Sequence, residues 1–381
     1  MTTLARKDWL RPRRVPFATR ALLYDRLRVA ISIGAIGFAI LLVLLLRGVM
    51  DGTVEKSTTY IDNVGADVVV AREGVTNMAL SASVLPGDVL EQVAAIPGVE
   101  KAAGIVRLPA IVTVGAENRP ATVIGYDLEQ QLGGPWKLSN GRGVENDDEI
   151  VVDHVLADQL GTDIGDAVMI SNRDFTIVGL SAQTAAIAGK HVFVSNAAAG
   201  DLVGVPGLVN FVLVTSAGTD DEALAANIEE SVPDVTATAQ SNISSNDRDL
   251  LSDLFIAPIN VMSTVGFLVG LAIIGLTMYT TTSERLHDFG VLKAIGAPFT
   301  YLLRAVVTQA LVLGGAGFVV GLLAAIAAGP LVVRLVPDIG VTINAIPALW
   351  TLGAVLVMSL LGAVVPVTRI AQVDPLVVFR R

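Results

Sequence analysis

Residues 283–305 read SERLHDFGVLKAIGAPFTYLLRA, and this charged stretch separates two long runs that contain no charged residue. The runs are 254–283, with 30 residues, and 305–333, with 29 residues. An α-helix rises about 1.5 Å per residue, so each run is long enough to cross a hydrocarbon core about 30 Å thick. We therefore expect the charged stretch to connect two transmembrane helices.

Two further charge-free runs lie at 29–46 and 339–368, in a chain of 381 residues that is 52% hydrophobic and 16% charged. The first run follows several arginines, as a signal peptide would. However, the next residues read RGVMDGTVEK, which offers no small-residue cleavage site and favours an uncleaved anchor. The sequence thus predicts four transmembrane helices, at 29–49, 254–283, 305–333 and 339–368.

The distribution of charge predicts the orientation of these helices. The segments 1–28, 284–304 and 369–381 together carry a net charge of +9, whereas the rest of the chain carries −19. Loops rich in lysine and arginine stay on the cytoplasmic side. Both termini and the 284–304 loop are therefore expected in the cytoplasm, and the region 50–253 outside.

The region 50–253 alternates strand-like and helix-like stretches. A strand at 65–72 and a helix at 85–96 are followed by a Pro-Gly turn and a further strand. The same order returns at 208–216 and 220–232, again with a proline turn and a strand. We expect a duplicated βαβ module in an α+β domain, with a strand-rich insert at about 115–205 between the copies.

Motifs for catalysis or metal binding are missing from the sequence. It has no cysteine, no P-loop, no G-x-S-x-G and no H-E-x-x-H motif, and its histidines at 154, 191 and 287 lie far apart. The acidic cluster 145–149 lacks the ligand spacing of a calcium loop and is interpreted as a solvated turn. A net charge of −10 disfavours a nucleic-acid partner. We predict no catalytic site, no metal and no cofactor bound directly.

The apolar runs contain no ionisable residue, which argues against a proton- or ion-coupled carrier. They do contain closely spaced glycines that allow helices to approach one another. These are Gly266, Gly270, Gly317 and Gly321. Glycine is also common in membrane helices generally, so the pattern fits either a packing face or ordinary composition.

The stretch 283–305 is amphipathic and is broken by Gly296-Ala297-Pro298. A short helix of this kind lies along the inner membrane face. Two interpretations remain open at this level. The helix is either a simple interfacial turn between two spans or an element that docks into a cytoplasmic partner and transmits its movements.

The residues Ser283–Ala297 resemble the coupling-helix region of FtsX-like permeases, which belong to ABC transport systems of the MacB, lipoprotein-release and FtsX type. Residues 146–180 and the terminal 373–381 are similar to other stretches of the same family. The opening segment DRLRVAISIGAIGFAILLVLLLRGVMDG looks particularly like the DevC subgroup. The order of spans also matches, with one span, a large extracytoplasmic domain and then three spans.

The resemblance implies a fold with four transmembrane helices plus a large α+β extracytoplasmic domain of the MacB/FtsX-like periplasmic core type. It implies a permease in a bacterial cell (inner) membrane, dimeric, that is not itself an enzyme and uses ATP through a separate ABC ATP-binding subunit. That subunit would dock on the coupling helix and drive transport by mechanotransmission. The implied docking residues are Glu284, Arg285, Asp288, Phe289, Gly290, Val291, Leu292, Lys293 and Gly296.

Within this family, two functions remain open. The first is export or extraction of a hydrophobic or envelope substrate, such as a lipid, lipoprotein, glycolipid or drug, with a possible extracytoplasmic adaptor. The alternative is an FtsX-like transmitter that regulates an extracytoplasmic hydrolase or sensor without transport. A membrane-anchored enzyme is a third class, for which the motifs give little support.

Overall fold

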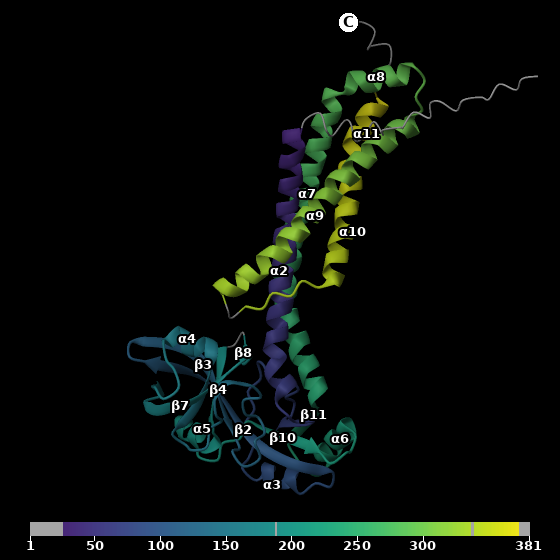
Figure 1. Cartoon of the computed structure of the whole chain (residues 1–381). Helices are drawn as coiled ribbons and strands as arrows, with labels where there is room; N and C mark the ends of the chain where they lie inside the picture. Colours follow the sequence, from purple (N-terminus) through teal and green to yellow (C-terminus); the bar gives the residue numbers. More distant parts are fainter. Residues whose placement is uncertain (1–25, 187–188, 337–338, 373–381) are drawn as a thin grey trace, which may run out of the picture. The chain divides into compact units, whose positions relative to one another are not determined.

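The computed structural model describes residues 26–186, 189–336 and 339–372, and Figure 1 shows how the helices and strands follow along the chain. The described residues form two compact units. The helical unit comprises 26–48, 258–331 and 343–372, and the α/β unit comprises the described parts of 49–257 and 332–342. The expected cytoplasmic segment 1–28 and tail 369–381 fall mostly outside the described residues.

Four helical stretches of the described chain are long and apolar enough to cross a membrane. They are α2 (Arg26–Asn63), α7 (Gln240–Glu284), α9 (Phe299–Leu335), and α10 (Ala345–Gly362) with its continuation α11 (Val364–Ala371). The first two are much longer than a bilayer requires, and they contribute residues to both units. This set of helices agrees with the predicted fold class.

The last long helix begins at Ala345, six residues later than the apolar run at 339–368 suggests. The reason is that residues 339–342 lie against α2 within the α/β unit. A Cβ atom on Gly340 would overlap the backbone of Gly52, so the two chain segments touch through their backbones. Lys56 Nζ donates to the Ile339 carbonyl at 3.2 Å, and Thr342 Oγ1 donates to Glu55 Oε2 at 3.1 Å. These bonds to α2 replace a helical turn.

Glycines set the closest helix contacts in the helical unit. A Cβ atom on Gly317 would lie 2.5 Å from Ile36 Cγ2, and one on Gly321 would lie 2.6 Å from the Gly37 carbonyl oxygen. Helices α2 and α9 therefore meet at a separation that only glycine permits at these positions.

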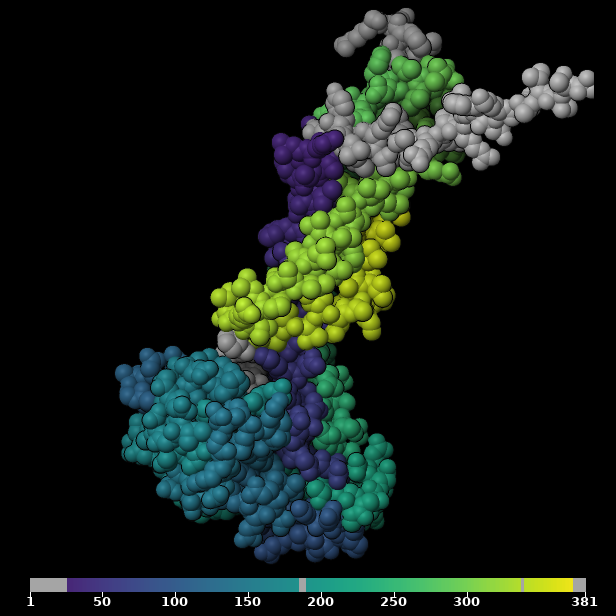
Figure 2. Space-filling model, in the orientation of Figure 1, coloured from purple at the N-terminus to yellow at the C-terminus, as the bar shows by residue number. Residues whose placement is uncertain are grey.

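Gly266 and Gly270 make the equivalent contacts of α7. Their Cβ atoms would lie 2.7 Å from Val43 Cγ2 and 2.5 Å from Met358 Sδ, on α2 and α10 respectively. Helices α9 and α10 also lie side by side, as Figure 2 shows, with Gly314 against Ser359. In lipid, such close packing replaces the hydrophobic driving force that water would supply.

The first part of the α/β unit is a four-stranded antiparallel sheet with two helices. Its strands are β1 (Val68–Arg72), β2 (Val99–Val114), β10 (Phe211–Ser216) and β11 (Val235–Ala239), and its helices are α3 (Val89–Ala94) and α6 (Asp221–Ser231). The strand order is β11-β1-β10-β2. Each βαβ copy thus has a strand of the other copy between its own two strands, which is the split βαβ arrangement.

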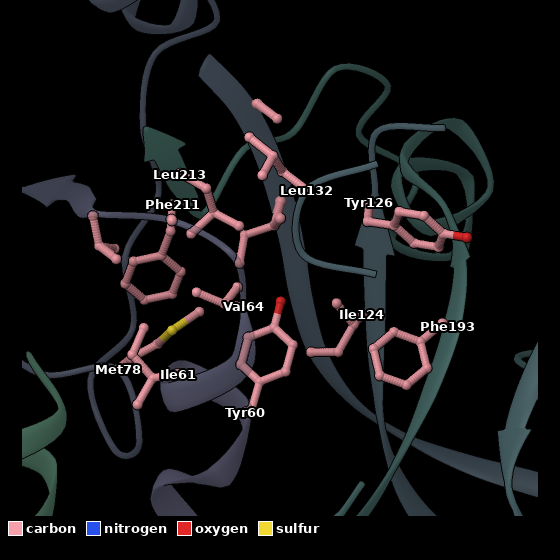
Figure 3. Close-up of a cluster of buried hydrophobic side chains, with 14 of the residues drawn as sticks. Tyr60, Ile61, Val64, Met78, Ile124, Tyr126, Leu132, Phe193, Phe211 and Leu213 are labelled. Atoms are coloured by element: carbon pink, nitrogen blue, oxygen red, sulfur yellow. The ribbon is translucent and has the colours of Figure 1, made fainter. Parts of the chain in front are cut away.

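Alternate residues of these strands face different layers, as the pleat of a strand requires. Val68 and Val70 belong to the core under α3 and α6. Val69 belongs instead to the core that contains Tyr60 and Ile61 near the end of α2. Figure 3 shows these α2 side chains beside strand residues of the sheet. The ends of α2 and α7 therefore form part of the fold of the α/β unit.

The insert extends the sheet beyond β2 in the order β2-β3-β9-β5-β7-β4, and β6 pairs with β2 and β7. Its strands are β3 (Glu117–Tyr126), β4 (Leu138–Gly141), β5 (Glu149–Asp153), β6 (Ala167–Ile170), β7 (Arg173–Ser181), β8 (Ala185–Ala186) and β9 (Gly189–Ser195). Helices α4 (His154–Leu160) and α5 (Asn196–Val203) pack against it around a separate apolar core. The insert is thus a strand-rich lobe that shares strand β2 with the split βαβ sheet.

Candidate functional site

The candidate site is helix α8 (Leu286–Ala294), which lies between α7 and α9 in the chain. Its C-terminus is closed by two backbone hydrogen bonds. The Gly296 N–H donates to the Lys293 carbonyl at 3.1 Å, and the Ala297 N–H donates to the Leu292 carbonyl at 2.9 Å. Gly296 has φ +91°, in the left-handed region. This is a Schellman cap, and it turns the chain towards α9.

Replacing Gly296 by alanine is expected to destabilise this turn by about 1 kcal/mol, because an L-residue with a side chain is strained at positive φ. Thermal unfolding of the full-length protein in detergent micelles measures the change. Gly275→Ala is the matched control, since Gly275 lies inside α7 and a Cβ atom there meets nothing within 4 Å. Equal melting temperatures for the two variants would contradict the role of the cap.

One side of α8 faces the helical unit. The Phe289 side chain is 2% exposed and belongs to the same apolar core as Ile370 of α11, and Gly290 is also buried. Lys293 Nζ donates to the Ala371 carbonyl at 3.1 Å. The expectation that Phe289 belongs to the docking face does not agree with this burial. Its side chain instead anchors α8 to the bundle.

The other side of α8 is exposed and carries both charged and apolar residues. Asp288 and His287 are exposed, Val291 is 38% exposed, and Ile295, just after the helix, is 74% exposed. Residues three and four apart share a helix face, so these side chains form one continuous stripe. Ile295 was not among the predicted docking residues, although its spacing of four from Val291 indicates the same face.

Glu284 lies at the end of α7 and forms an ion pair with Arg28 of α2, with Nη1 and Oε1 2.7 Å apart. Both side chains are partly exposed, so the pair contributes little to stability. Its value is geometric, because it aligns the first turn of α2 with the last turn of α7. Of the remaining predicted residues, Arg285, Leu292 and Lys293 are partly buried and Gly296 is exposed.

The acidic cluster at 145–149 has a structural role. The Arg142 guanidinium donates to both oxygens of Glu149, at 2.7 and 2.6 Å, and these bonds hold the pKa of Glu149 well below its usual range. The Ser195 hydroxyl donates to Asp147 Oδ1. Within the described ranges, no three histidine or acidic side chains are grouped so that they could hold a metal ion.

His191 is the one histidine of the described chain that is fully enclosed in a core. Its Nδ1 lies 2.6 Å from the Thr184 carbonyl oxygen. Burial, together with the nearby charge of Arg107, lowers the pKa of His191 to about 4. It is therefore neutral near pH 7, with the proton on Nδ1.

The apolar helices, the α/β unit and the capped surface helix define a polytopic membrane protein with a folded domain outside the helical bundle. Residues 29–231, more than half of the chain, match the model of the MacB-like periplasmic core domain, and residues 260–375 match that of the FtsX-like permease C-terminal region. The chain thus belongs to the family of ABC transporter permeases that combine these two regions.

Individual relatives are consistent with this family. An uncharacterized ABC transporter permease of Mycobacterium bovis is 29% identical over 378 residues, which cover 95% of this chain and 98% of the relative. The macrolide export ATP-binding/permease protein MacB of Nitrosomonas europaea is 20% identical over 94% of this chain and 58% of its own. Among solved structures, the periplasmic region of MacB from Actinobacillus actinomycetemcomitans aligns with a TM-score of 0.38 and 12% identity, covering 48% of this chain and 92% of that one.

Proposed function

We propose that this permease couples ATP hydrolysis by a separate ATP-binding subunit to the export or extraction of a hydrophobic or envelope substrate. The ATP-binding subunit would dock on the exposed stripe of α8, and the permease would work as a dimer in a bacterial inner membrane with both termini in the cytoplasm. The observation that carries the proposal is the geometry of α8. It is anchored by the buried Phe289, capped at Gly296, and exposes Asp288, Val291 and Ile295 together.

Transmission by movement of the helices is supported by two features of α2 and α7. Each continues as one helix well beyond its apolar run. Beyond that run, polar bonds join them: Ser244 Oγ donates to Asp62 Oδ1 at 2.5 Å, and Gln240 Nε2 donates to the Ile61 carbonyl at 2.7 Å. Because Ile61 also belongs to a core of the β-sheet, a shift of these joined helices would displace the sheet.

The docking surface is tested by placing a charge in its apolar part. Ile295→Asp, and separately the charge reversal Arg285→Glu/Asp288→Arg, are expected to reduce the co-purifying ATP-binding subunit at least about tenfold, because a loss of 1.4 kcal/mol at an interface changes affinity by that factor. The measurement is affinity purification in mild detergent with quantification of the bound ATPase.

The matched control is Ile346→Asp, which also places an acid at an exposed isoleucine, 71% exposed, in the first turn of α10. It should retain the ATPase, since α9 separates α8 from the start of α10 along the bundle. Normal ATPase recovery with both α8 variants would reject the docking assignment. Identification of the exported proteins that co-purify separates a transporter from a regulator of a hydrolase.

A further inference from the structure

A pocket of about 270 Å³ lies in the α/β unit, between the ends of α2 and α7 and the segment that follows β1. Its apolar wall is formed by Ile61, Met78, Leu80, Leu251, Leu254 and Phe255. Figure 3 shows Ile61 and Met78 with their side chains close together at this point. The pocket is slightly smaller than a typical site for a drug-sized ligand.

The rim of the pocket is apolar and exposed. Leu80 and Leu254 are each 56% exposed, and Phe255 is 38% exposed. Clustered apolar side chains of this kind on the surface of a folded domain gain free energy when an apolar group covers them. The rim therefore favours a hydrocarbon ligand.

The floor of the pocket is polar, but its charges are engaged by the protein itself. Arg107 Nη1 donates to the Met78 carbonyl at 2.5 Å, and Asp247 Oδ1 accepts from the N–H groups of Met78 and Ala79 at 2.8 and 2.9 Å. The two opposite charges hold this segment from both sides and keep Leu80 at the rim. The floor thus carries no net charge, which suits a neutral chain better than a charged head group.

The sequence of α7 places this rim next to the membrane surface. Its charge-free run is twelve residues longer than that of α2, and the Arg28–Glu284 ion pair aligns the two runs at their cytoplasmic ends. Twelve residues correspond to about 18 Å of helix. Leu254 and Phe255, at the start of the longer run, therefore extend past the hydrocarbon core on the outer side, where lipid chains are close at hand.

We propose that this pocket binds one acyl or alkyl chain of a neutral, lipid-like amphiphile at the outer face of the membrane. The assignment rests on the proposed function, because it names the substrate class of the permease. A concave pocket of this size accepts a single chain, whereas a helix of a second copy would need a longer groove.

The test uses the full-length protein in nanodiscs with a monoacylglycerol that carries a photoreactive diazirine at the end of its acyl chain. After irradiation, label is expected on the tryptic peptide 73–101, which contains Met78 and Leu80, and an excess of unlabelled monoacylglycerol should remove it. Label on the lipid-facing part of α7 serves as the internal reference, since it should not be saturable.

Two variants locate the site. Leu254→Glu/Phe255→Glu is expected to lower the label on peptide 73–101 at least about tenfold, as follows from the loss of 1.4 kcal/mol of apolar contact. Ile256→Glu is the matched control, because Ile256 is 49% exposed on the same helix but does not line the pocket. Its label should stay within about twofold of the wild type, well below the tenfold step of 1.4 kcal/mol.

The outcomes separate this pocket from the proposed function. Unsaturable label, or an equal loss in the two variants, overturns the pocket even where the ATP-binding subunit still co-purifies. Saturable label without any ATP-binding partner supports the pocket and rejects the transporter. A double variant that loses a dimer on size-exclusion chromatography, with unchanged label, assigns the rim to a second copy and also overturns the proposal.

Discussion

Gly321→Val is expected to lower the free energy of unfolding of the helical unit by about 3 kcal/mol, at the upper end of what overpacking a tight contact costs. A Cβ atom at this position would lie 2.6 Å from the Gly37 carbonyl oxygen and 2.8 Å from Ile40 Cβ. The first of these atoms belongs to the backbone of α2, so no side-chain rotation relieves the overlap. Helices α2 and α9 would have to separate, which loosens the packing along their whole contact.

The same helix offers a matched control for this change. Gly315 lies two turns earlier in α9, and a Cβ atom there meets nothing within 4 Å. Gly315→Val should therefore unfold at nearly the temperature of the wild type in detergent micelles, whereas Gly321→Val should unfold well below it. If the two valine variants behaved alike, the loss would reflect the residue type and not the α2–α9 contact.

The sequence alone predicted the helical unit well because a bilayer imposes a simple rule. A span needs about 20 apolar residues, and uncharged runs of that length are visible without any knowledge of contacts. The split βαβ sheet was also accessible, since 65–96 and 208–232 repeat one order of elements. The strand order that interleaves the copies could not be predicted, because strand pairing depends on long-range contacts.

The orientation of α8 was harder to predict for a specific reason. Phe289, Val291, Leu292 and Ile295 are all apolar, so the sequence marks no single apolar face. Only packing against α11, more than 70 residues later in the chain, shows that Phe289 points inward and Ile295 outward. The start of α10 depends in the same way on a distant contact, that between residues 339–342 and α2.

The pocket of the α/β unit was not predictable at all. Its wall combines Ile61, Leu80 and Leu254, and His191 closes its floor from strand β9. These residues come from four separate parts of the chain, and none of them belongs to a recognisable motif. His191 could be noted in the sequence only as an isolated histidine, whereas the fold encloses it completely.

The enclosure of His191 predicts that the α/β unit loses stability as the pH falls from about 6.5 to about 4. The pKa of His191 is about 4 in the folded state, against an ordinary value of 6.5. Between these values the unfolded chain binds a proton that the folded chain does not, so the free energy of unfolding decreases as the pH falls. The loss amounts to about 3 kcal/mol and stops below the folded pKa, where both states are protonated.

His191→Gln should remove this decline, because glutamine does not titrate and its amide N–H group can replace the donor to the Thr184 carbonyl. His154→Gln is the control and should keep the decline, since His191 is intact in it. Trp136 packs against Tyr60 and Phe193, with ring centroids 6.0 and 6.4 Å apart, so its fluorescence reports unfolding around this core. Parallel pH profiles for the wild type and His191→Gln would show that the proton is taken up elsewhere, whereas convergence of the two profiles near pH 6.5 and divergence towards pH 4 would assign it to His191.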